Sequence, residues 1–93
     1  MSFPKDLVSA WDMKASLRLR GVQIDGAVAA RLSSYELNLE RLVYAGLTDD
    51  QRASVAAGYD PGTKSPAQLR DAARADLAFL MQVIRDAPRG GVQ

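Results

Sequence analysis

The chain has 93 residues, of which 47% are hydrophobic and 25% charged, and its formal net charge is +1. This length suits one domain with a modest core, and the composition is that of a folded chain. We expect a single helical domain over residues 1–86 and a flexible tail over 87–93. The charges form no strongly basic block, which argues against the phosphate-binding surface of a typical nucleic-acid binder.

The sequence contains neither cysteine nor histidine. This excludes disulfides, thiolate metal ligands, a thiol nucleophile and the commonest general base. We therefore predict that the protein is not an enzyme and holds no cofactor or metal. With no apolar run long enough to span a bilayer and no secretory signal pattern, we expect a cytoplasmic protein. Its richness in arginine and alanine is common in high-GC bacteria and their phages.

The first helix is predicted over residues 4–20, beginning at Pro4 and ending at Gly21. Its main apolar stripe is Val8, Trp11, Ala15, Leu19 and Val22. We expect Trp11 to fill the core, although it could instead anchor a partner. Ala10, Met13 and Leu17 lie on a neighbouring arc. Residues 17–24 also alternate between apolar and polar, so a short extended segment is the alternative there.

The central helix is predicted over residues 26–45, with Asp25 as its N-cap and a left-handed Gly46 at its end. Its principal seam has the spacing of a helix packed on another helix and comprises Val28, Leu32, Tyr35, Leu39 and Leu42. A second stripe, Ala30, Leu37 and Tyr44, lies on nearly the opposite side. A helix that is apolar on two faces needs two partners. The second partner could come from the same chain or from another molecule.

Two capping boxes predict the remaining helices. Thr48 with Gln51 predicts a short connecting helix over 49–57, and Ser65 with Gln68 predicts a long helix over 66–86. The last helix carries an apolar face made of Leu69, Ala73, Leu77, Leu80, Val83 and Ile84. Asp76 lies at the edge of this face, where we expect it to reach solvent; a pair with Lys14 or Arg18 is the alternative.

These elements predict an all-α fold, a small antiparallel bundle of three main helices plus one short connecting helix. A helical hairpin completed by a second copy is the alternative form. The paired carboxylates Glu36 with Glu40 and Asp49 with Asp50 could hold a cation. We interpret the first pair as a solvated flank and the second as helix capping.

Surplus apolar surface without catalytic residues indicates a non-enzymatic protein–protein interaction module. It would act as a homodimer or as a small accessory or phage-type modulator that binds a host protein, with no small-molecule substrate. The predicted partner-binding residues are Leu37, Tyr44, Ala30, Trp11, Leu7 and Phe3. The alternative is a small DNA-binding transcriptional regulator, in which the helices on either side of residues 59–65 would form a helix-turn-helix.

Overall fold

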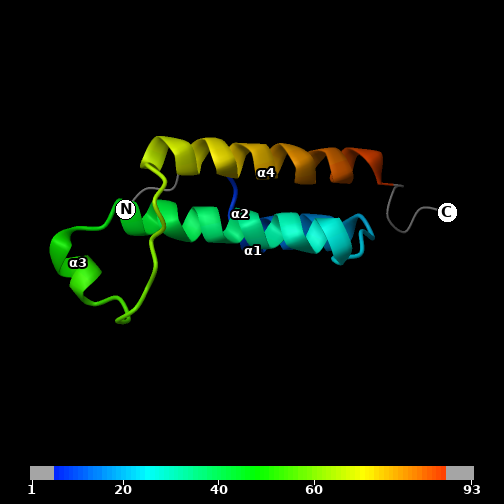
Figure 1. The fold of residues 1–93 in the computed structure, drawn as a ribbon. Coiled ribbons are helices and arrows are strands. Elements are labelled where there is room, and N and C mark those ends of the chain that lie inside the picture. The colour runs from blue at the N-terminus through cyan, green and yellow to red at the C-terminus, as the bar shows by residue number, and fades with distance from the viewer. Residues whose placement is uncertain (1–5, 88–93) are drawn as a thin grey trace.

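The computed structural model describes residues 6–87, and over this range the chain is all-helical. It contains α1 (Ala10–Leu19), α2 (Gly26–Ala45), α3 (Asp49–Ala53) and α4 (Pro66–Asp86). Helices α2 and α4 run antiparallel and side by side, α1 packs on this pair, and α3 lies beyond the carboxyl end of α2 (Figure 1). The predicted all-α class is confirmed. Phe3, Pro4 and residues 88–93 of the predicted tail lie outside the described residues.

The core lies between α2 and α4, as the apolar stripes predict. From α2 it takes three residues that are at most 6% exposed: Leu32, Tyr35 and Leu39. From α4 it takes Leu69, Ala73, Leu80 and Ile84. Val28, Leu42, Leu77 and Val83 pack around these as half-buried neighbours. The predicted pairing of the central seam with the last helix is therefore confirmed.

Helix α1 begins at Ala10 rather than at Pro4, so it is shorter than predicted. Ser9 is its N-cap, and the Ser9 hydroxyl accepts the backbone N–H of Asp12 at 3.0 Å. Before the cap the chain is held by the core. Leu7 is buried, and the Tyr35 hydroxyl accepts the Val8 N–H at 3.1 Å and donates to the Val8 carbonyl at 2.5 Å. These tertiary contacts keep residues 7–9 out of the helix.

The buried face of α1 is also different from the predicted one. Met13 and Leu17 are buried, whereas Trp11 is 79% exposed and Leu19 is 80% exposed. The prediction that Trp11 fills the core is wrong. Helix α1 contacts both α2 and α4, and a single line of residues spaced by four fits between them. The flexible Met13 side chain suits that narrow space better than an indole ring.

Residues 17–24 form a helix end and a loop, without extended pairing. Gly21 has a φ of +72°, and its N–H bonds to the Arg18 carbonyl at 3.0 Å. The Val22 N–H bonds to the Leu17 carbonyl at 2.9 Å, which completes a Schellman motif. Gly21 is therefore the helix stop that the sequence predicts.

Helix α2 has the predicted bounds but not the predicted caps. Asp25 occupies the N-cap position without making a side-chain hydrogen bond to the first turn. The next residue, Gly26, has a φ of +50°, so the first turn departs from the geometry that the Asp25 carboxylate would cap. Gly46 at the other end has a φ of −87° and is not left-handed.

Both predicted capping boxes are present. The one at Thr48 starts α3, and the one at Ser65, followed by Pro66 at the first helical position, starts α4. Helix α4 has the predicted bounds, whereas α3 stops at Ala53 instead of residue 57. No residue of α3 is buried, so little packing offsets the cost of extending so short a helix.

Candidate functional site

A buried carboxylate fixes how α2 and α4 meet. Asp76 of α4 is 4% exposed and does not reach solvent, contrary to the prediction. Its carboxylate accepts hydrogen bonds from three side chains of α2: Ser34 at 2.8 Å, Asn38 at 3.0 Å and Arg31 at 3.2 Å. The expected alternative partners, Lys14 and Arg18, are on α1 and do not pair with it. These interactions give Asp76 a structural role.

The other side of α2 carries an open apolar groove. Helix α1 has 10 residues and α2 has 20, so α1 spans about half the length of α2 at 1.5 Å per residue. The carboxyl-terminal half of α2 remains uncovered beyond the start of α1, and the hollow there has a volume of about 430 Å³. Its lining consists of Ser9, Ala10, Glu36, Leu39, Glu40, Val43, Tyr44, Leu47, Val55 and Tyr59.

The lining of the groove is mainly apolar, with two carboxylates among the α2 side chains. Leu39, Val43 and Leu47 follow at steps of four residues and therefore lie along one face of α2 and its extension. Glu36 and Glu40 are exposed beside them, and the Lys14 amine lies 3.8 Å from the Glu36 carboxylate. Such a surface favours an apolar occupant that has basic residues along one edge.

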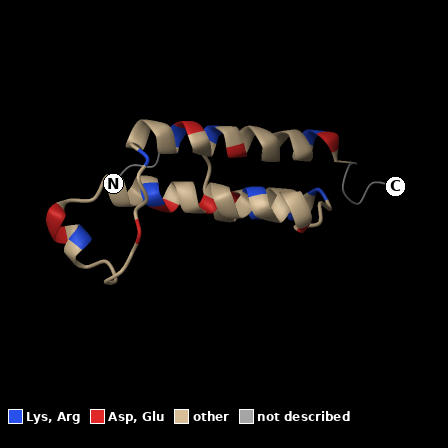
Figure 2. Cartoon of the chain, in the orientation of Figure 1, with Lys and Arg blue, Asp and Glu red and all other residues tan. Residues whose placement is uncertain are grey.

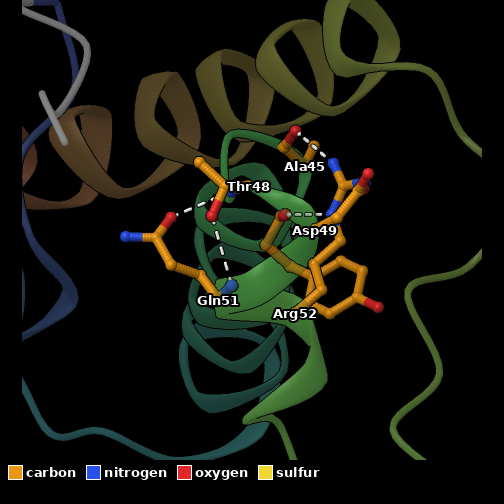
Figure 3. A network of polar contacts seen from close by, with 6 residues as sticks. Ala45, Thr48, Asp49, Gln51 and Arg52 are labelled. Atoms are coloured by element: carbon orange, nitrogen blue, oxygen red, sulfur yellow. Dashed lines mark hydrogen bonds and ion pairs between the residues drawn. The ribbon is translucent and has the colours of Figure 1, made fainter.

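Arg52 links α3 to the end of α2. The residues that follow α3 close this end of the groove. Arg52 donates to the carbonyl of Ala45 at 2.8 Å (Figure 3) and to that of Tyr44 at 3.3 Å, which belong to the last turn of α2. The Asp49 carboxylate pairs with the same guanidinium at 3.7 Å. Together with the Thr48 capping box, these contacts hold α3 in place, and Val55 and Tyr59, which follow α3, form the end wall of the groove.

Two tyrosines form the corner between the wall and the floor. The rings of Tyr44 and Tyr59 lie 4.9 Å apart with an interplanar angle of 38°. Burial raises the pKa of the Tyr59 hydroxyl above its ordinary value of 10.0. The Tyr59 hydroxyl oxygen is buried and has no hydrogen-bond partner among the described residues. The lining at this corner is therefore mainly the surface of the two aromatic rings.

Among the predicted partner-binding residues that the structure describes, which exclude Phe3, only Tyr44 lines the groove. Leu37 is 41% exposed and Ala30 is exposed, but both lie outside the groove lining. Trp11 is exposed beside the groove, on α1. Leu7 is buried in the chain's own core, which leaves it no surface for a partner.

Sequence reasoning missed Val43, Leu47, Val55 and Tyr59 as members of this surface. Val43 and Leu47 continue a four-residue spacing from Leu39, and that signal could have found them. Val55 and Tyr59 follow α3, and their place depends on how α3 folds back.

Other kinds of site receive little support from the described residues. Residues 6–87 hold no group of three or more acidic, histidine or cysteine side chains that could bind a metal ion. Among the helices of this range, none is both long and apolar enough to cross a membrane. Basic and acidic residues are interspersed along the helices (Figure 2). Residues 54–65 join α3 to α4, a connection longer than a helix-turn-helix uses.

No protein-family model matches the chain, and no similar protein was found among curated proteins or solved structures.

Proposed function

We propose that this chain is a non-enzymatic protein–protein interaction module that binds a protein segment in the groove on α2. The observation that carries the proposal is the hollow of about 430 Å³ lined by Leu39, Val43, Leu47 and the two tyrosine rings. Apolar grooves between helices commonly receive the apolar face of a partner's helix. Sites for small molecules usually add several converging polar groups, and here the polar lining side chains are few.

The apolar surface continues outside the groove. Trp11, which follows the lining residue Ala10, is 79% exposed, so a large apolar side chain adjoins the apolar lining. Contiguous surface of this kind typically marks an interaction site in a folded domain. The occupant can be a second copy of the chain, or a host protein if the chain is a small accessory or phage-type modulator.

A charge placed in the groove tests the proposal. Val43→Asp puts a carboxylate beside Glu40, and Met81→Asp is the matched control, since Met81 is 38% exposed on α4 and does not line the groove. We would cross-link and affinity-purify tagged wild type and both variants from the native cell. Circular dichroism would show that each variant is folded.

The expected result is that wild type and Met81→Asp retain the same protein, either this chain or another one, and that Val43→Asp loses it. The proposal is refuted if Val43→Asp retains every protein that wild type retains. It is equally refuted if wild type retains no protein at all.

A further inference from the structure

The outer face of α1 is itself an unpartnered apolar surface, with basic residues along one edge and Asp12 along the other. Trp11 and Leu19 are about four-fifths exposed, and Ala15 lies between them at four-residue spacing. At about 100° per residue, Trp11 lies roughly 200° around the helix from the buried Met13. This stripe therefore points away from α2 and α4. Lys14 and Arg18 lie beside it.

The groove complements this face in length and in charge. Between Glu36 and Leu47 the floor spans about 16 Å, and the 10 residues of α1 span about 15 Å. The groove carries the carboxylates of Glu36 and Glu40, and the outer face of α1 carries Lys14 and Arg18 along one edge. Lys14 already pairs with Glu36 of its own chain, so the charge match across copies rests on Arg18 and Glu40. A helix with these properties is the kind of occupant that the groove favours.

Resting on the proposed function above, we infer that the groove receives α1 of a second copy of this chain. In each copy α1 lies on α2 directly beside the groove, because Ser9 and Ala10 line it. A partner's helix in the groove would therefore lie next to α1, on the same side of α2. The partner's α2 then covers the outer face of the first copy's α1, so each copy provides one helix and one groove.

This arrangement closes on itself as a two-fold dimer, in which both contacts use the same pair of surfaces. Two copies of Trp11 become buried, and tryptophan is among the residues that contribute most to protein interfaces. The net charge of +1 opposes the pairing of identical chains only weakly.

The first test is the mass of the full chain over a wide concentration range, by light scattering on a size-exclusion column. We expect the mass to rise from 10.1 kDa to twice that value. The chain has a single tryptophan. Its emission should move to shorter wavelength over the same concentration range, because Trp11 leaves water for an apolar groove.

The second test separates the two halves of the contact. Trp11→Ala leaves the groove intact but removes the tryptophan that would bind in it. Val43→Asp keeps this tryptophan but places a charge in the groove. Each variant alone should be monomeric where wild type is dimeric, and Met81→Asp should dimerise as wild type does. In an equimolar mixture of the two variants, Trp11 of Val43→Asp can still bind in the intact groove of Trp11→Ala. The tryptophan emission of the mixture should then move to shorter wavelength.

Two results would overturn the inference: a wild-type mass that stays at 10.1 kDa at every concentration, or a Trp11→Ala variant that dimerises like wild type. A strictly monomeric chain that still retains another cellular protein, lost in Val43→Asp, overturns only the second-copy inference. A monomeric chain that retains no protein refutes the proposed function as well.

Discussion

Removal of the Asp76 carboxylate should destabilise the fold although Asp76 lies outside the groove. Asp76→Ala leaves the Asn38 amide, which is 5% exposed, without the acceptor that it has at 3.0 Å. A buried donor left unpaired costs about 1–3 kcal/mol. The Arg31 side chain is 42% exposed and can turn to water, so losing its ion pair adds about 0–1 kcal/mol. We expect the free energy of unfolding to fall by about 1–4 kcal/mol.

Urea denaturation followed by circular dichroism measures this loss. The matched control is Asp71→Ala, since Asp71 is on the same helix, is 78% exposed and pairs with Arg74 at 3.6 Å; it should change stability by less than about 0.5 kcal/mol. Replacing Asp76 and Asn38 together by leucine should recover most of the loss because no buried donor is then left unpaired. If Asp76→Ala is as stable as the control, the buried network does not hold α2 and α4 together.

Three further predictions concern the core, the alkaline limit and a cap. Leu80→Ala should lower the free energy of unfolding by about 2–5 kcal/mol, because Leu80 is fully buried; a loss below about 1 kcal/mol by urea denaturation would contradict the core assignment. Burial raises the pKa of Tyr35 above its ordinary value of 10.0, so the folded chain holds this proton more tightly than the unfolded chain. The contribution of the protonated Tyr35 to the free energy of unfolding is therefore complete below pH 10, and it is lost as the pH rises through the higher pKa of the folded chain. Tyr35→Phe should make unfolding less sensitive to pH above 10, and an unchanged alkaline profile would count against this explanation. Ser65→Ala should cost about 1 kcal/mol through loss of the bond to the Gln68 N–H, with Ser65→Asp, which keeps an acceptor, costing much less; equal losses in the two variants would show that the hydroxyl is not the cause.

The long helices could be predicted from sequence because their signals are local. Ser65, Pro66 and Gln68 together define the start of α4, and the spacing of Leu32, Tyr35 and Leu39 identifies the buried face of α2. Each signal depends on residues within one or two helical turns.

The start of α1 could not be predicted in this way, because two local signals compete. Pro4 suits a first helical position and Ser9 suits an N-cap. The contact that holds Val8 out of the helix comes from Tyr35, 27 residues away. The choice between the signals therefore depends on tertiary structure, and so does the face of α1 that becomes buried.

Dependence on tertiary structure also explains why the Asp76 network and the groove were not predicted. Asp76 lies at the edge of an apolar arc, and its donors are 38 to 45 residues away on α2. The groove exists because α1 is short and because the residues after α3, Val55 and Tyr59, return to the end of α2. Of the second stripe of the central helix, Ala30, Leu37 and Tyr44, only Tyr44 lines the hollow.

The attachment of α3 has a consequence for the dynamics of the groove. Its floor belongs to α2, whose core residues are buried, whereas its end wall, Val55 and Tyr59, follows α3, a helix without buried residues that is held by the polar contacts of Arg52 and Thr48. Segments with few buried apolar contacts open locally at much lower free energy than the global unfolding of the domain. Amide hydrogens of α3 should therefore exchange with solvent long before those at the centre of α2. The groove thus combines a rigid floor with a movable wall, which can adjust to an occupant without disturbing the pair of long helices.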